Sequence, residues 1–99
     1  MTEQEKQKLN EKLARWAGCE DGYITLMGIR YSYFTNSLDA CFKWLVPKLD
    51  YFCLQREDAG RGFYADVSIG EQYAEYYQGE TQPLALCLAV EKLIDEESK

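Results

Sequence analysis

The sequence predicts an α+β domain, a three-stranded antiparallel meander with helices packed against it. Three observations predict this class. Apolar residues recur at helical spacing near both ends and in the middle of the chain, three segments of alternating polarity follow one another between residues 50 and 78, and glycines mark the turns between those segments. The expected order of elements is α, α, β, β, β, α, with a loop after the first helix.

Length and charge limit the fold and its partners. The chain has 99 residues, so residues 1–99 are expected to form a single domain, with a frayed polar tail at residues 95–99. Acidic residues number 17 and basic residues 11, which gives a net charge of −6. Because binding to a phosphate backbone needs clustered cations, no nucleic-acid partner is expected.

The chain also lacks the signals of export and of metal binding. No apolar run approaches the roughly 18 residues that a transmembrane helix needs, and the charged N-terminus does not resemble a signal peptide. We therefore expect a cytoplasmic protein with no membrane partner, and its four cysteines as free thiols. With no histidine and no C-x-x-C spacing, neither a metal nor a cofactor is expected.

The first helix is expected from Thr2 to Gly18. Thr2 and Glu5 form a capping-box pattern, in which each side chain accepts a backbone N–H at the start of the helix. Gly18 suits the left-handed conformation that ends helices. The predicted apolar stripe consists of Leu9, Leu13, Trp16 and Ala17.

Residues 19–36 show no clear periodicity. Turn signals at Asp21-Gly22 and Gly28 alternate with aromatic and β-branched residues. Two interpretations stay open, a packed loop and a short strand at Tyr23–Met27. A long ordered loop is often functional, and the simpler alternative is that its apolar residues cover an edge of the core.

The second helix is expected to begin at a cap on Asn36 or Ser37. Pro47 has no N–H to donate, so the regular helix should end near Val46. Trp44 falls opposite the core stripe, where either the first helix covers it or it is exposed in a contact surface. The predicted core stripe is Leu38, Cys41, Phe42, Leu45 and Leu49.

Three strands are expected at residues 50–57, 62–69 and 71–78, with a hairpin turn at 57–62. In the second strand, Phe63, Ala65, Val67 and Ile69 should face the helices and Tyr64, Asp66 and Ser68 should face solvent. A helix is the alternative for residues 71–78. The last helix should begin at a Thr81 cap and be the most buried one, because its apolar face is wide.

Three segments together resemble the phage ABA sandwich domain family over nearly the whole chain. They are LNEKLARWAG, YFTNSLDACFKWLVPKL and GETQPLALCLAVEKLI. The resemblance implies a small phage or prophage protein with an α–β–α sandwich fold, and implies no particular activity. Two departures from the commoner pattern are Asn36-Ser37 in place of an aspartate cap and Pro47 in place of a charged residue.

The sequence contains no catalytic constellation. Without histidine, Ser–His and Cys–His pairs are impossible, and Gly60-x-Gly62 alone indicates a hairpin turn. Asp66, Glu71 and Glu75 share a predicted sheet face, where solvation is the ordinary role of such acids. We therefore expect a protein that is not an enzyme.

Tyrosine is the residue type that stands out, with eight in the chain. Alternation places Tyr73 and Tyr77 on one face with Glu75, expected to be the outer face of the sheet, and Tyr64 beside them. Exposed aromatics near acids form a plausible protein-binding patch, whereas cross-strand stacking is the structural alternative. The candidate protein-binding residues are Tyr64, Tyr73, Tyr77 and Trp44.

The expected function is binding of a protein partner, either a host factor or a second copy in a homodimer. Inhibition of a host defence factor is the hypothesis that the phage resemblance suggests, in the host cytosol. One alternative is a binder of a nucleotide-like small molecule, with Tyr31 and Tyr33 stacking on the ligand in a pocket between residues 19–36 and the sheet. Another is a structural component of the virion.

Overall fold

A computed structural model describes residues 2–18, 24–26, 29–31, 34–35, 37–56 and 62–97, with the backbone alone at 24–26 and 29–31. The helical elements are α1 (Glu3–Ala17), α2 (Leu38–Ala40), η2 (Cys41–Leu45), η3 (Val46–Lys48) and α3 (Gln82–Glu97). The strands are β1 (Ile24–Leu26), β2 (Ile29–Tyr31), β3 (Tyr51–Arg56), β4 (Phe63–Ile69) and β5 (Gln72–Gly79). The α+β class, the meander order β3-β4-β5 and the expected order of elements are confirmed.

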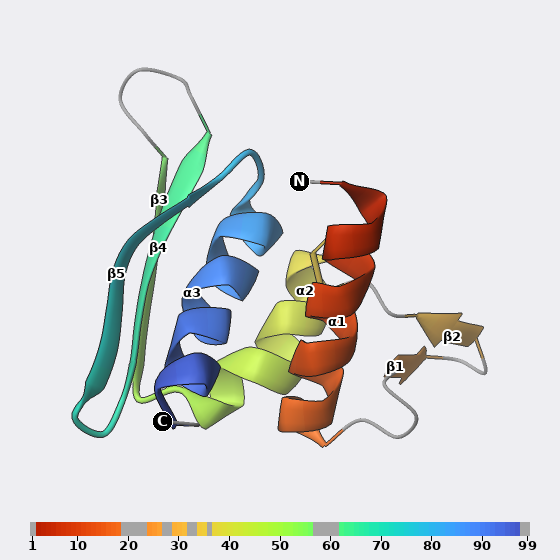
Figure 1. Ribbon diagram of the computed structural model, residues 1–99, viewed down its shortest axis with the longest axis horizontal. Coiled ribbons are helices and arrows are strands. Elements are labelled where there is room, and N and C mark those ends of the chain that lie inside the picture. Colours follow the sequence, from red (N-terminus) through yellow and green to blue (C-terminus); the bar gives the residue numbers. More distant parts are fainter. Residues whose placement is uncertain are drawn as a thin grey trace.

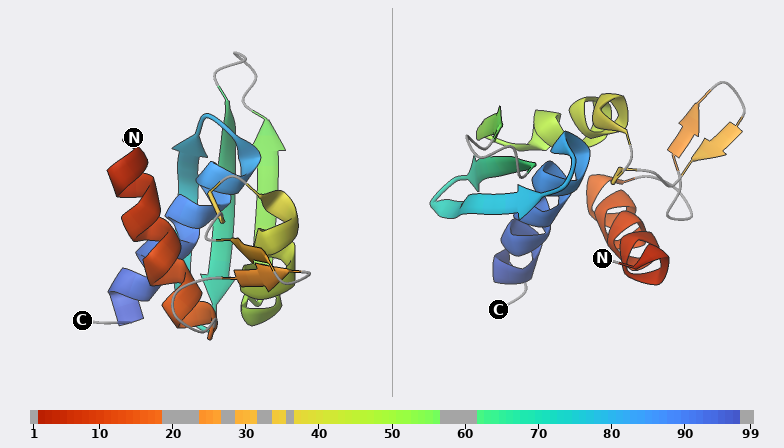
Figure 2. Two further views of the ribbon diagram at one scale, coloured as in Figure 1. Left: turned by 90° about the vertical axis from the view of Figure 1, so that its right-hand side faces the viewer. Right: turned by 90° about the horizontal axis from the view of Figure 1, so that it is seen from above.

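The layering of the domain is one-sided. α3 lies against the sheet, and α1 and the α2–η3 helix lie beyond or beside α3 on the same side (Figures 1 and 2). The short antiparallel pair β1–β2 lies farther out, beyond α1 (Figure 1). One face of the sheet therefore packs on helices, and no described helix covers the other face.

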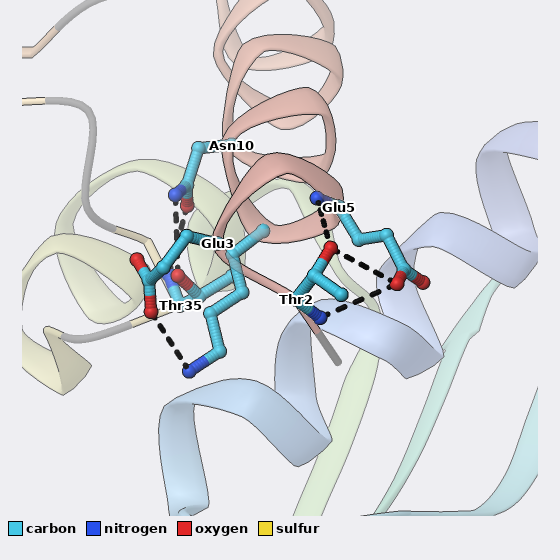
Figure 3. A network of polar contacts seen from close by, with 6 residues as sticks. Thr2, Glu3, Glu5, Asn10 and Thr35 are labelled. Atoms are coloured by element: carbon cyan, nitrogen blue, oxygen red, sulfur yellow. Dashed lines mark hydrogen bonds and ion pairs between the residues drawn. The ribbon is translucent and has the colours of Figure 1, made fainter.

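The start of α1 follows the predicted capping box. The Thr2 hydroxyl accepts the Glu5 N–H at 3.2 Å, and the Glu5 carboxylate accepts the Thr2 N–H at 3.3 Å (Figure 3). The bonds that the Thr2 N–H and the Thr2 hydroxyl donate to the Glu5 carboxylate lower the pKa of Glu5, because they favour its charged form. At the other end Gly18 adopts φ 85, as predicted for a left-handed cap.

A buried polar pair joins α1 to the segment before α2. Asn10 Nδ2 donates to Thr35 Oγ1 at 3.1 Å, and the Thr35 N–H donates to Asn10 Oδ1 at 2.9 Å (Figure 3). Both residues are buried, and Phe34 beside them is fully buried. This pair fixes residues 34–35 against α1 without leaving an unpaired amide in the core.

The helix at residues 38–48 changes type along its length. Ser37 Oγ accepts the Ala40 N–H at 3.2 Å, which confirms Ser37 as a cap; Asn36 lies outside the described residues. The prediction of a regular helix that ends near Val46 is wrong. Only α2 is α-helical, η2 is a π-helix, and η3 is a 3₁₀ helix that continues to Lys48. Pro47 fits the first turn of η3, where its missing N–H is not needed.

The buried face of this helix is centred on Cys41 and Leu45, both fully buried. Phe42 was predicted to lie in the core stripe and is 41% exposed, whereas Trp44 is half-buried and packs against the core. The two aromatics flank the centre of the face because Trp44 follows Cys41 by three residues and Phe42 precedes Leu45 by three. Leu38 and Leu49 also pack against the core, so the predicted stripe is confirmed except for Phe42.

The sheet confirms the three predicted strands, including the strand interpretation of residues 71–78. In β4 the alternation is as predicted. Ala65 and Val67 are fully buried, and Phe63 and Ile69 pack against the core. The predicted hairpin turn at 57–62 lies outside the described residues except for Gly62.

The last helix is the main contact of the sheet with the helical layer. Thr81 caps it as predicted, since its hydroxyl accepts the Leu84 N–H at 3.3 Å. α3 continues to Glu97, so residues 95–97 of the predicted tail are helical. Its buried residues are Leu84, Ala85, Leu86, Cys87, Ala89, Val90 and Leu93, consistent with the wide apolar face.

Candidate functional site

The candidate site is the face of the sheet that no described helix covers, which we call the outer face. Register and exposure define it, because residues that pair across strands share a face. Its members are Tyr51, Cys53, Gln55, Tyr64, Asp66, Ser68, Tyr73, Glu75, Tyr76 and Gln78. This set includes four tyrosines and two carboxylates and no basic side chain.

A β-bulge in β5 shapes the outer face. Ala65 pairs with Tyr77, whereas Val67 pairs with Ala74, so Asp66 lies opposite both Glu75 and Tyr76. One extra residue in a strand reverses the alternation beyond it. Glu75 and Tyr76 are both exposed as a result.

Tyr76 holds the bulge in an unusual backbone conformation. Its φ is 62, and among the described residues it is the one non-glycine with a positive φ. The Tyr76 N–H donates to Asp66 Oδ1 at 2.8 Å, so the carboxylate of β4 secures the extra residue of β5. A left-handed conformation costs a tyrosine about 1–2 kcal/mol, which the surrounding sheet must offset.

The bulge places Tyr76 directly on Tyr64. Their rings stack with centroids 4.6 Å apart and an interplanar angle of 15°. The Tyr64 hydroxyl also donates to Gln55 Oε1 on β3. Tyr76 nevertheless remains 64% exposed, so the stack supports the ring from one side and leaves it accessible to a partner.

A second pair lies toward the other end of β5. The Tyr73 hydroxyl donates to Glu75 Oε1, and Tyr73 is 57% exposed. Across the sheet, Tyr51 and Tyr73 each pair with Ser68, so both tyrosines lie in one cross-strand row. The hydrogen bond with the Cys53 side chain raises the pKa of Tyr51.

The carboxylates of the outer face are engaged by the protein itself. Asp66 accepts the Tyr76 amide and Glu75 accepts the Tyr73 hydroxyl. Among the described residues, no group of three or more acids or thiols lies close enough together to hold a metal ion. The acids therefore give the face a negative charge and position its aromatic rings.

The structure corrects one candidate and confirms the placement of two. Tyr64 and Tyr73 lie on the outer face, as predicted. The prediction for Tyr77 is wrong, since Tyr77 is half-buried and packs against the core on the helix-covered face. The physical reason is the bulge, because the extra residue turns Tyr77 inward and Tyr76 outward.

Trp44 lies away from this face, in the helical layer. It is half-buried against the core, and the Lys43 ammonium lies 5.6 Å from its ring centroid. Its indole N–H is buried without a hydrogen-bond acceptor among the described residues. Trp44 therefore contributes to packing and does not join the tyrosines.

The residues of the alternative ligand site lie largely outside the part of the chain that the structure describes. Tyr31 ends β2, its side chain is not described, and Tyr33 lies outside the described residues. The β1–β2 pair and the three-stranded sheet lie on opposite sides of the helices (Figures 1 and 2). The short-strand interpretation of residues 23–27 is confirmed for Ile24–Leu26.

An open groove on α1 and the end of α3 is lined mainly by charged side chains. There Lys12 pairs with Asp95 at 2.5 Å and with Glu91 at 3.5 Å. The hydrogen bond that the Lys12 ammonium donates to Asp95 raises the pKa of Lys12. These ion pairs join α1 to α3.

Sequence reasoning missed two tyrosines of the face, Tyr51 and Tyr76. Tyr51 could have been found by extending the alternation of β3 to its first residue. The outward position of Tyr76 could not have been found from the sequence. No glycine or asparagine marks the left-handed position, and the bulge depends on the pairing with β4.

A comparison of the chain with protein-family models, curated proteins and solved structures finds no match. The resemblance to the phage ABA sandwich domain family therefore stays a prediction. No helix in the described part of the chain has both the length and the apolar character needed to cross a membrane.

Proposed function

We propose that the protein acts by binding another protein through the outer face of its sheet. The observation that carries this proposal is Tyr76, held in a left-handed conformation and stacked on Tyr64 while most of its surface stays accessible. Backbone strain concentrates at sites where the strained geometry serves a function. Here the strain presents an aromatic ring that a regular strand would direct into the core.

The chemistry of the face defines the kind of partner. Tyrosine buries a large area at low cost in side-chain entropy and is enriched in binding hot spots. Asp66 and Glu75 surround the rings with negative charge, and the chain as a whole carries −6. The partner should therefore present arginine or lysine among apolar residues, since such cations stack on tyrosine rings and pair with carboxylates.

The phage resemblance favours a host protein as this partner, with inhibition of a host defence factor as the outcome. The cytoplasm is the proposed location. Cys41 and Cys87 support it, because their sulfurs lie 3.8 Å apart as free thiols, which persist in a reducing compartment.

A comparative capture experiment tests the proposal. Tagged wild type, Tyr76→Gly, Tyr73→Ala and Lys8→Ala would serve as baits in a lysate of cells that express the chain, with quantitative mass spectrometry of the bound proteins. Lys8→Ala is the control, because Lys8 is exposed on α1 and away from the sheet. A partner of the outer face is retained by wild type and Lys8→Ala and lost from both tyrosine variants.

Two results would count against the proposal. In the first, every protein retained by wild type is retained equally by Tyr76→Gly and Tyr73→Ala. In the second, the tyrosine variants lose binding only because they are unfolded, which thermal unfolding of each bait would reveal.

A further inference from the structure

The two edges of the sheet differ in how they are protected against pairing with another strand. The β5 edge carries the bulge at Tyr76 together with Glu71 and Glu75, and bulges and charges are the usual means of blocking an edge. β3 keeps an unbroken register with β4 over all six of its residues and has no described strand on its other side. The β3 edge is therefore the one that can accept another strand.

Exposed aromatic residues gather at this unprotected edge. Tyr51 is 51% exposed on the outer face, and Phe52 is 37% exposed on the other face. Phe42 of η2 is 41% exposed and meets Phe52 in a T-shaped contact with centroids 5.4 Å apart. Apolar groups thus flank the open backbone of β3 on both faces, which is typical of an interface.

We propose that β3 pairs antiparallel with β3 of a second copy about a two-fold axis through Cys53. Residues that lie opposite each other in the two copies must point to the same face of the sheet. The alternative registers therefore differ from this one by shifts of two residues. With Cys53 on the axis, Phe52 lies opposite Leu54 of the second copy, and Tyr51 lies opposite Gln55 of the second copy. The exposed Phe52 thereby gains an apolar neighbour in each copy.

The charges at the ends of β3 select this register. Asp50 precedes the strand and Arg56 ends it, so an antiparallel pair centred on Cys53 brings Asp50 opposite Arg56 of the second copy, twice. Asp50 is held at that end because its carboxylate accepts the Gly70 N–H at 2.6 Å. A shift by two residues would place Arg56 opposite Phe52, or Asp50 opposite Leu54. A parallel pair in register would place like charges together.

In the dimer, the two three-stranded sheets form a single six-stranded sheet, and the two outer faces form one continuous surface. Such a surface presents its tyrosines twice, so a partner with two matching sites gains affinity through effective concentration. The dimer stands independently of the proposed function, because a monomeric variant keeps a complete outer face and can still bind a single site.

Charge reversal with rescue tests the dimer. Light scattering coupled to size-exclusion chromatography should give wild type a mass approaching twice 11.5 kDa as concentration rises. Arg56→Asp should return the mass to that of the monomer, because it places two acids together at each end. The double variant Asp50→Lys and Arg56→Asp should restore the dimer. Thermal unfolding of each variant confirms that it is folded.

Crosslinking tests the position of the axis. In a Cys19→Ser background, a short thiol-to-thiol crosslinker should join two copies through Cys53, whose β-carbons lie about 5 Å apart in directly opposed positions. Cys41 and Cys87 are buried and do not compete. A matched variant, Cys53→Ser with Glu75→Cys, moves the thiol to the β5 edge and should give no covalent dimer. A wild type that stays monomeric at every concentration, or a dimer that persists in Arg56→Asp, would overturn the proposal.

Discussion

The ring of Tyr76 stacks on the ring of Tyr64 with centroids 4.6 Å apart, and this contact exists because a one-residue bulge brings Tyr76 to the outer face. Without the bulge, regular alternation would direct Tyr76 toward the helices. A single irregularity in β5 therefore determines which tyrosines lie on the outer face.

Because Tyr76 has a left-handed conformation, we expect glycine to be more favourable than alanine at this position, the reverse of the usual order in a strand. Tyr76→Gly should be more stable than Tyr76→Ala by about 1 kcal/mol, because glycine adopts a positive φ without steric cost. Urea denaturation of both variants measures the difference. Tyr73 is the matched control, since its φ is not positive and there glycine should be less stable than alanine by about 0.5–1 kcal/mol. An alanine preference at both positions would show that the bulge is absent in solution.

The inward position of Tyr77 predicts a large effect on stability. Tyr77→Ala should lower the free energy of unfolding by about 2–3 kcal/mol, because it removes a ring that packs against the core. Tyr73→Ala, at an exposed position of the same strand, should cost less than about 1 kcal/mol. Similar losses in the two variants would contradict the assignment of Tyr77 to the helix-covered face.

The buried pair of Asn10 and Thr35 predicts a polar contribution to the core. Asn10→Ala should cost about 1–3 kcal/mol, because it leaves the buried Thr35 N–H without an acceptor. Gln7→Ala is the control on the exposed face of α1 and should change stability by less than about 0.5 kcal/mol. Equal unfolding midpoints for the two variants would refute the pairing.

Close packing of the backbone around Gly62 predicts that alanine is more destabilising there than at Gly70. A β-carbon at Gly62 would lie 2.5 Å from the Gly79 carbonyl oxygen, whereas one at Gly70 would meet nothing within 4 Å. Both residues have positive φ, so Gly70→Ala should cost about 1 kcal/mol and Gly62→Ala clearly more. Thermal unfolding distinguishes them, and a Gly62→Ala protein as stable as Gly70→Ala would contradict the close approach of β4 and β5.

The buried thiol of Cys87 predicts a loss of stability in alkali. Burial raises the pKa of Cys87 well above its ordinary value, and the neighbouring Cys41 thiol adds to the rise. Above the ordinary thiol pKa of about 8.5, Cys87 ionises in the unfolded chain but stays protonated in the folded one, so stability falls as pH rises. Denaturation at about pH 7 and about pH 9.5 should show a shallower fall for Cys87→Ala than for wild type. Identical pH slopes would exclude this contribution.

The sequence predicted those features of the fold that depend on neighbours along the chain. The caps at Thr2, Ser37 and Thr81 and the alternation of β4 belong to this class, because a hydroxyl three residues from an amide or a period of two is visible locally. Features set by distant partners were missed. Asn10 is buried because Thr35 satisfies it from 25 residues away.

The candidate site could be predicted in kind but not in detail. Counting tyrosines and acids correctly indicated an aromatic, acidic sheet face with Tyr64 and Tyr73 on it. Tyr76 and Tyr77 were exchanged, since the bulge arises from the Asp66 contact and the pairing with β4 rather than from a local turn residue. The sequence left two positions open for Trp44, covered or exposed, and the structure shows it half-buried against the core.

The proposed role of Tyr76 in binding through the outer face is tested by the Kd of a captured partner for purified wild type and for Tyr76→Gly, by calorimetric titration. We expect the Kd to rise at least about 30-fold, as for a hot-spot residue, while the free energy of unfolding changes by less than about 1 kcal/mol. An unchanged Kd for a folded Tyr76→Gly protein would contradict it.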